Sequence, residues 1–183
     1  MNDLAPERAY PQDLETWQIT KSGLKIFLRP IKFGDGPRYK VFLQSLSDQS
    51  VYFKFFRLIR LTDDFVARLV DAAYVREMVI FALAGEGMEE RVLGMGRYIL
   101  NKDERAAEVY FAVRDDQQNL GIGRELLLHL TRVARKRGLK GFTAQVMVDN
   151  RGMLRVFRSF EGKEFKIRRT IEAGIFYLDM EFL

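Results

Sequence analysis

The residues with the clearest potential for chemistry are Gln118, Gly121 and Gly123, which stand between a predicted strand and a predicted helix. The first N–H groups of a helix have no partners within the helix, and the helix dipole makes this end positive. Because glycine has no side chain, two glycines would leave these N–H groups open to close approach. The segment indicates a binding loop for a diphosphate, although a plain strand-to-helix turn can carry the same glycines.

Two other phosphate-binding loops are excluded by the spacing. No Gly-Lys-Ser/Thr follows Gly123, as a Walker loop would require, and the G-x-G-x-x-G spacing of dinucleotide-binding folds is absent. The sequence contains no cysteine, which excludes disulfides, thiolate catalysis and cysteine-based metal sites. Its single histidine, His129, argues against a zinc enzyme or a Ser-His-Asp hydrolase, so we expect no metal. We expect His129 to be an exposed partner of Glu125, one helical turn away.

The bulk composition is that of a folded protein of one domain. The sequence has 183 residues, of which 48% are hydrophobic and 13% aromatic, and this is enough for a packed core. Its 30 Lys and Arg against 25 Asp and Glu give a net charge of +5 that suits an anionic ligand. Basic and acidic residues are interleaved, so we expect no nucleic-acid partner. Without a signal-like segment or an apolar run of about 18 residues, we expect a soluble, cytoplasmic protein with no membrane contact.

The apolar periodicity predicts strands and helices in alternation. Strands are expected over 17–20, 24–28, 78–84, 92–100, 108–113 and 142–148, with two more in the tail from Phe165, the second over 175–182. Helices are expected from Asp35 as a cap, from Ser47 or Ser50, from 62–64, over 122–137 and from Asn150.

Two connections then define the fold class. A strand–helix–strand unit implies a parallel pair joined by a right-handed crossover, while the three runs between 78 and 113 indicate an antiparallel meander. We therefore predict an α/β (α+β) fold with a central mixed, mostly antiparallel sheet of about seven strands flanked by helices. A single domain is expected over 17–183, preceded by an irregular N-terminal extension over 1–16.

The glycine segment also carries a family resemblance. Gln118-x-x-Gly121-x-Gly123, following 113–116, resembles the Gln/Arg-x-x-Gly-x-Gly/Ala signature of the GNAT acetyltransferases, and the likeness extends from about Gly23 to the C-terminus. A second segment, 46–55 (Leu-Ser-x-x-Ser-x-Tyr-x-Lys-Phe), is similar to a motif of the bacterial protein lysine acetyltransferases. Their GNAT domain is often joined to an acyl-CoA-synthetase-like region, which is absent here, so we expect a stand-alone domain.

The resemblance implies that acetyl-CoA is the co-substrate and that its pyrophosphate binds the glycine loop. The implied cofactor-binding residues are Ala112, Val113, Gln118, Asn119, Leu120, Gly121, Ile122, Gly123, Arg124 and Asn150. The pantetheine arm would lie along Ala112 and Val113, where family members splay two parallel strands apart. Asn150 would touch this arm, although it could equally be a simple helix cap. For the ribose 3′-phosphate, Arg124 is a better candidate than the basic residues 132–137, which we interpret as a solvated helix face.

The implied chemistry requires a base, because a lysine amine has a pKa near 10.4 and must lose a proton before it attacks a thioester. Glu108 occupies the strand position that resembles the family's general base, acting directly or through water; it could also be a plain surface glutamate. A backbone N–H near Val113 is the implied donor to the thioester oxygen. Phe157 stands about where many members have a tyrosine that protonates the leaving thiolate, and phenylalanine has no proton to give. Tyr110 or water are therefore the remaining candidates for this general acid.

We therefore predict an N-acetyltransferase that acts on a primary amine, most simply a lysine of another protein, with an acyl-CoA synthetase as one candidate. A small amine or amino acid as acceptor, and an acyl-CoA-binding regulatory module with little turnover, are the alternatives. The aromatic residues at 52, 53, 55 and 56 are expected in the core, unless one of them lines the acceptor site. The acceptor's identity, the acyl-chain preference and the oligomeric state stay open.

Overall fold

The computed structural model describes residues 9–55, 62–70, 74, 76–85, 87 and 90–183, and it contains one central sheet. Its strands are β1 (Thr16–Ile19), β2 (Lys25–Pro30), β3 (Glu77–Ala84), β4 (Arg91–Leu100), β5 (Ala106–Val113), β6 (Gly141–Met147), β7 (Phe165–Glu172) and β8 (Ile175–Phe182). They lie in the order β1-β2-β3-β4-β5-β6-β8-β7. Only β5 and β6 are parallel neighbours. The predicted mixed, mostly antiparallel sheet is confirmed, and it has eight strands where about seven were expected.

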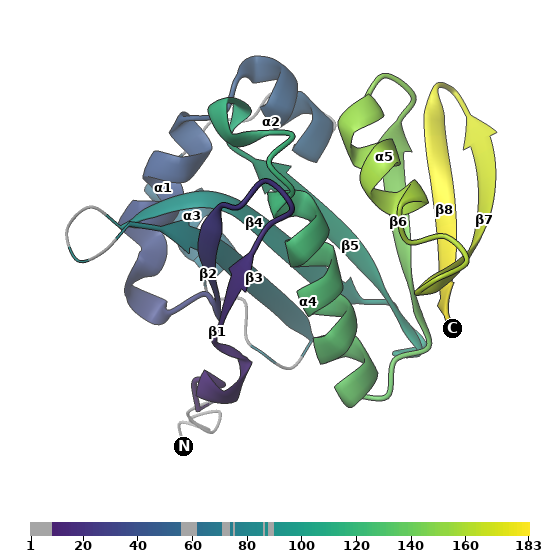
Figure 1. Ribbon diagram of the computed structural model, residues 1–183, viewed down its shortest axis with the longest axis horizontal. Coiled ribbons are helices and arrows are strands. Elements are labelled where there is room, and N and C mark those ends of the chain that lie inside the picture. The colour runs from purple at the N-terminus through teal and green to yellow at the C-terminus, as the bar shows by residue number, and fades with distance from the viewer. Residues whose placement is uncertain (1–8, 56–61, 71–73, 75, 86, 88–89) are drawn as a thin grey trace.

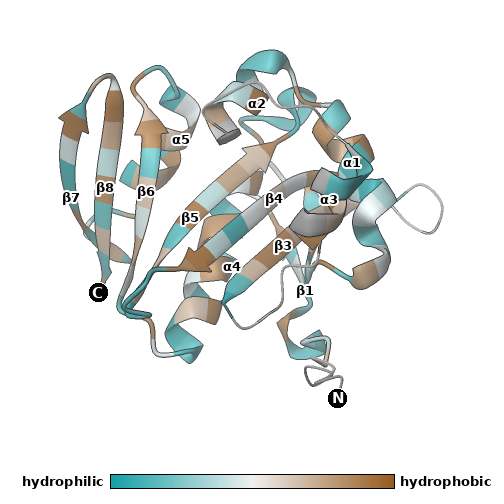
Figure 2. Ribbon diagram, turned by 180° about the vertical axis from the view of Figure 1, so that it is seen from behind, coloured by the Kyte–Doolittle hydropathy of each residue, from teal (hydrophilic) through white to brown (hydrophobic). Residues whose placement is uncertain are grey.

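Five helices of the described residues cover the two faces of this sheet. They are α1 (Gly36–Gln44), α2 (Asp48–Phe55), α3 (Asp63–Val70), α4 (Ile122–Lys136) and α5 (Arg151–Arg158). α4 and α5 cover one face, and α1, α2 and α3 lie on the other (Figures 1 and 2). The stripe predicted for α4, Leu126, Leu130 and Val133, is buried against the sheet. No helix of the described residues is long and apolar enough to span a membrane.

A glycine in β4 lets α4 lie close to the sheet. A Cβ atom on Gly96 would lie 2.9 Å from Cδ1 of Leu130 and 2.9 Å from the ring of Phe111, which is closer than real side chains come. The close approach brings the start of α4 next to the end of β5, and the intervening loop lies between them (Figure 1).

The parallel pairing between β5 and β6 is short. It covers only Ala106 to Glu108 on β5, opposite Gly141 to Thr143 on β6. Beyond these residues, β5 continues to pair with β4 and β6 continues to pair with β8, so the two strands diverge (Figure 1). The sheet therefore opens like a V between β5 and β6, on the side where β5 ends and α4 begins.

α1 begins directly after Asp35, as predicted, but the carboxylate of Asp35 does not cap the helix because it has a different partner. Both oxygens of Asp35 accept hydrogen bonds from the guanidinium of Arg29, at 2.6 and 2.8 Å, and the Lys32 N–H donates to Oδ2 at 2.6 Å. The carboxylate makes no side-chain cap on α1. Burial alone would raise the pKa of Asp35, but the bonds from Arg29 and Lys32 outweigh it and lower the pKa. This buried ion pair fixes the end of β2 to the start of α1.

The prediction for His129 is wrong. Its side chain is buried at 6% exposure, near the backbone of Leu14, and among the described residues its Nε2 atom has no hydrogen-bond partner. Glu125 instead accepts a hydrogen bond from Arg124. Leu14 packs in the same hydrophobic core as the buried stripe of α4. The residue pattern of α4 alone does not reveal that the N-terminal segment covers this side of the helix. Burial, with the nearby charge of Arg132, lowers the pKa of His129 from 6.5 to about 4.

This histidine should make the fold acid-sensitive at mildly acidic pH. Between pH 6.5 and about 4, unfolded chains bind a proton at His129 and folded chains do not, so stability falls as pH falls through this window. Linkage gives a loss of about 2 kcal/mol between pH 7 and pH 5. Urea unfolding at both pH values should show this loss in the wild-type protein and a correspondingly smaller one in His129→Asn. Equal losses in the two proteins would contradict the assignment, since the sequence has no other histidine.

Candidate active site

A cleft of about 460 Å³ lies at the open end of the V, between β5, the loop that follows it, α2 and α5. Nine of the ten residues expected to bind the cofactor line it: Ala112, Val113, Gln118, Asn119, Gly121, Ile122, Gly123, Arg124 and Asn150. Leu120 does not line the cleft. Its carbonyl oxygen instead accepts a hydrogen bond from Ser22 Oγ at 2.9 Å, which ties the loop to the turn between β1 and β2.

The loop presents a row of free backbone donors. Within the part of the chain that the structure describes, none of the N–H groups from Asn119 to Gly123 donates to a protein acceptor. Asn119 (φ 64°) and Gly121 (φ 90°) are both left-handed, and this conformation turns the chain sharply into α4. Consecutive free N–H groups at a helix start bind anions, and a diphosphate matches them in charge.

The loop is also fixed to α2 by Asp115. One carboxylate oxygen of Asp115 accepts from the Ser47 N–H at 2.9 Å, and the other accepts from the Ser47 and Ser50 hydroxyls, both at 2.8 Å. Ser47 also caps α2, because its hydroxyl oxygen accepts a hydrogen bond from the Ser50 N–H. Of the two predicted caps, Ser47 and Ser50, the structure therefore has Ser47. Burial would raise the pKa of Asp115, but the bonds from Ser47 and Ser50 lower it, so the group stays ionised. Sequence reasoning missed this role, although the 46–55 motif contains both serines.

The gap between β5 and β6 offers backbone groups along its length. Arg114 N–H donates to the Leu93 carbonyl on the β4 side at 2.9 Å. Successive backbone groups of a strand alternate in direction, so those of Phe111 and Val113 point into the gap. The side-chain amide of Gln118 donates to the Val113 carbonyl at 3.3 Å. An extended polar chain lying in this gap could therefore bond to β5 as a strand would.

A smaller hollow of about 30 Å³ continues the gap toward the point where β5 and β6 meet. Phe53, Tyr110, Gln145 and Phe157 are among its lining residues. Tyr52 is 45% exposed, so its expected place in the core is wrong, whereas Phe53 lines the cleft and the hollow, which is the alternative left open for one of these aromatic residues. The side chain of Phe55 and the whole of Phe56 lie outside the described residues. Phe157 is buried, with its ring 6.2 Å from that of Phe111.

Glu108 does not line the hollow itself but lies next to two residues that do. Gln145 Nε2 donates to Glu108 Oε1 at 3.2 Å, and Tyr110 is two residues further along the same face of β5. Burial, and then the neighbouring carboxylate of Glu108, raises the pKa of Tyr110 well above its ordinary value. The phenol therefore stays protonated. The carboxylate thus lies next to the inner end of the hollow, within reach of a group entering from the uncovered face of the sheet.

Two further expected residues have structural partners. Asn150 caps α5, because its Oδ1 accepts from the Met153 N–H at 3.1 Å. Arg124 donates to Glu125 at 2.8 Å and its guanidinium lies 5.1 Å from the centre of the Phe160 ring, so its charge is already compensated. Among the described residues there is no group of three or more His, Cys, Asp or Glu that could hold a metal ion.

Comparisons with known proteins agree with this geometry. A sequence model of the acetyltransferase (GNAT) family matches residues 48–161. An acetyltransferase of Pseudomonas aeruginosa is 30% identical over 132 residues, which cover 72% of this chain and 71% of that protein. The GNAT domain of S. lividans PAT is 28% identical with a TM-score of 0.83, covering 95% of this chain and 100% of that one. A cAMP-binding acyltransferase from Mycobacterium smegmatis (22% identity, TM-score 0.61, 91% and 46% covered) shares the fold.

Gly121 and Gly123 should respond differently to alanine. At Gly121 (φ 90°) a Cβ would lie 3.2 Å from Thr20 Cβ, so Gly121→Ala should destabilise the protein by about 1–3 kcal/mol and weaken coenzyme A binding roughly tenfold or more. At Gly123 a Cβ would meet Val156 at an ordinary 3.6 Å, so Gly123→Ala is the matched control and should keep near wild-type affinity. Calorimetric titration with coenzyme A checks both; equal losses in the two variants would refute the free-amide cradle.

Asp115→Asn should loosen α2 from the loop. The neutral amide is a weaker acceptor for the two serines, so KM for acetyl-CoA should rise roughly threefold to tenfold, equivalent to about 1 kcal/mol. Asp116→Asn is the matched control, because within the described residues the carboxylate of Asp116 is paired with the neighbouring Arg114 and makes no bond to α2. Steady-state kinetics at varied acetyl-CoA concentration measures KM for both variants, and only Asp115→Asn should show the increase. An unchanged KM in Asp115→Asn would show that α2 does not help to shape the cleft.

Proposed function

The chain belongs to the acetyltransferase (GNAT) family, and on that premise we propose that it acetylates lysine side chains of a protein acceptor with acetyl-CoA. An acyl-CoA synthetase is the acceptor that we would test first. The observation that carries the proposal is the continuity of one path: the free amides of the loop, the gap along β5, and the inner hollow that ends beside Glu108.

The residues fit the co-substrate at each part of this path. The loop N–H groups from Asn119 to Gly123 would hold its diphosphate, and the backbone of Phe111 and Val113 would hold the amide-containing arm. The N–H groups of β5 that face the gap are also available to a carbonyl oxygen that gains negative charge during transfer.

Glu108 supplies the base in this proposal. The acceptor ammonium gives a proton to the Glu108 carboxylate, directly or through water, and its nitrogen then bonds to the acetyl carbon while the carbon–sulfur bond breaks. The second proton that the nitrogen loses passes, through water, to the departing thiolate, which leaves as the thiol. Gln145 donates to Glu108 and holds its carboxylate beside the hollow. Phe157 has no proton to give, but a thiol of pKa about 8.5 is a tolerable leaving group without an acid.

A protein acceptor suits the open side of the sheet. On the face opposite α4, α2 contacts one end of β5, while no described helix covers β6, β8 and β7 (Figure 2). Glu108 and Tyr110 alternate with Val109, which packs in the α4 core, so their side chains belong to this uncovered face. A lysine on a partner's surface could reach it. The likeness to the GNAT domain of S. lividans PAT over its whole length also favours this acceptor class.

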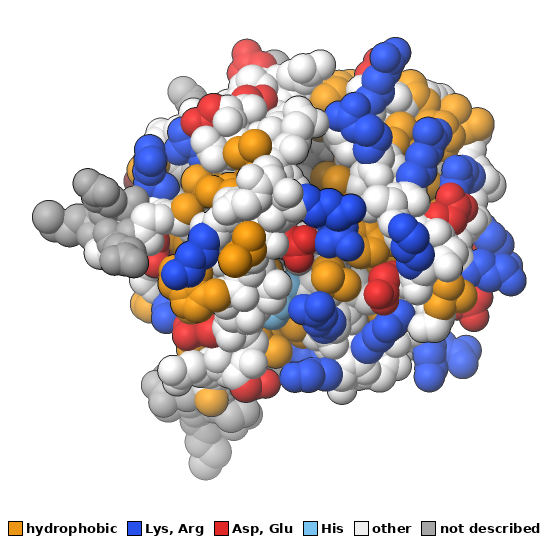
Figure 3. Space-filling view, viewed as in Figure 1, with side chains coloured by type: hydrophobic (Ala, Val, Ile, Leu, Met, Phe, Trp, Pro, Cys, Tyr) orange, Lys and Arg blue, Asp and Glu red, His pale blue; other side chains and the backbone are white. Residues whose placement is uncertain are grey.

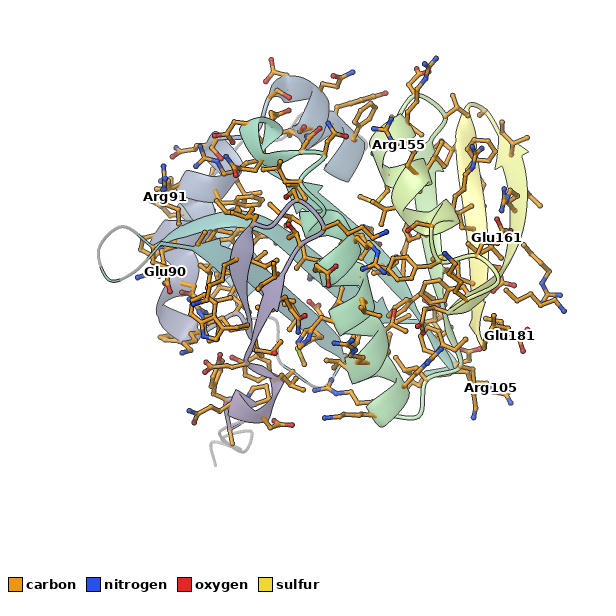
Figure 4. The ribbon with its side chains drawn as sticks, viewed as in Figure 1. Glu90, Arg91, Arg105, Arg155, Glu161 and Glu181 are labelled. Carbon is orange, nitrogen blue, oxygen red and sulfur yellow. The ribbon has the colours of Figure 1, made fainter. Side chains whose placement is uncertain are left out.

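Removal of the carboxylate tests the proposal. Glu108→Gln should lower kcat by roughly 10²- to 10⁴-fold and leave the dissociation constant of coenzyme A within about twofold. The matched control is Glu181→Gln, because Glu181 is an exposed glutamate at the far end of β8 (Figure 4). Thiol release and acceptor mass should be measured with an acyl-CoA synthetase and with a panel of free amines.

Each other outcome would identify a different function. Turnover with free amines alone would assign a small-molecule acceptor. Coenzyme A binding with no turnover on any acceptor, and no effect of Glu108→Gln, would indicate a binding module rather than an enzyme.

A further inference from the structure

One face of α5 carries three arginines without acidic partners. Arg151, Arg155 and Arg158 are spaced by four and three residues, which places them on the same side of the helix, and all three are exposed. None forms an ion pair with a carboxylate in the described part of the chain. Like charges at this spacing repel each other, so an anion bound between them would relieve that repulsion.

This arginine face adjoins the cofactor loop. Arg155 donates to Asn119 Oδ1 at 3.0 Å, and Arg151 and Arg155 both line the cleft that contains the loop. Figure 4 shows Arg155 on the side of α5 toward α2, and Figure 3 shows basic side chains gathered over α5 at the upper right. Arg158 lies one turn further on; it shares an outer hollow with Arg151 and Arg155 but does not line the cleft that contains the loop.

We propose that Arg151 and Arg155 bind the 3′-phosphate of coenzyme A and make the protein selective for cofactors that carry it. This inference rests on the proposed function. The 3′-phosphate is attached to the same ribose unit as the diphosphate, so it can reach only groups close to the loop, and these two arginines are there. Arg124, the candidate from sequence, is less suited because Glu125 and Phe160 already compensate its charge. A guanidinium whose only partner is a neutral amide keeps its full attraction for a phosphate.

The proposal is tested by calorimetric titration of the whole protein with coenzyme A and with 3′-dephospho-coenzyme A. The wild-type protein should bind coenzyme A roughly tenfold more tightly. The double variant Arg151→Gln/Arg155→Gln should bind the two ligands about equally, at the wild-type affinity for the dephospho form. Arg158→Gln is the matched control and should keep the wild-type preference.

Other outcomes overturn the inference in distinguishable ways. Equal wild-type affinity for both ligands would refute the 3′-phosphate site and leave the proposed function intact, whereas no binding of either would refute the proposed function itself. A loss of preference in Arg158→Gln equal to that of the double variant would show a general charge effect. A double variant with an unchanged preference but a raised KM for the protein acceptor would assign the arginines to an acidic segment of that acceptor.

Discussion

The early end of pairing between β5 and β6 is the constraint on which the site depends. Three residues on each strand are paired, and beyond them the backbone of β5 has no strand partner on that side. Continuous pairing would use the same N–H and C=O groups that the gap leaves open. The sheet on either side of the gap is complete, so the opening is held by two rigid halves rather than by a loose loop. A ligand bound there completes hydrogen bonding that the fold leaves unfinished.

The loop at the mouth of this gap is held from three directions by polar contacts. Ser22 fixes it to the first hairpin, Asp115 fixes it to α2, and Arg155 reaches it from α5. These bonds join segments that lie far apart in the chain, and they hold the loop while its own N–H groups stay free. Because the contacts are near the surface, each contributes little to global stability, and their effect is on the shape of the cleft.

The parts of the fold that local chemistry determines were predictable from sequence. The strand, the glycine turn and the α4 helix follow from periodicity and from the residues at their ends, and the order of elements follows from the same patterns. The roles of Asp35, His129 and Asp115 were not predictable in this way. Each depends on a partner that only the tertiary structure supplies: Arg29 for the first, Leu14 for the second, and Ser47 with Ser50 for the third. The same limit applies to the arginines near the cofactor loop. The sequence shows where they are, but only the tertiary structure shows which of them are paired with a carboxylate and which are free to bind a phosphate.

The gap also has a consequence for the way the protein is made. During synthesis β5 leaves the ribosome well before β6, which follows only after the whole of α4. Through this interval the full edge of β5 has no neighbour on that side, and it includes the apolar residues Val109, Phe111 and Val113. Unpaired apolar strand edges are templates for association with other chains. The nascent polypeptide therefore passes through a stage in which the future binding edge is an unpaired apolar strand edge, until α4 and β6 dock.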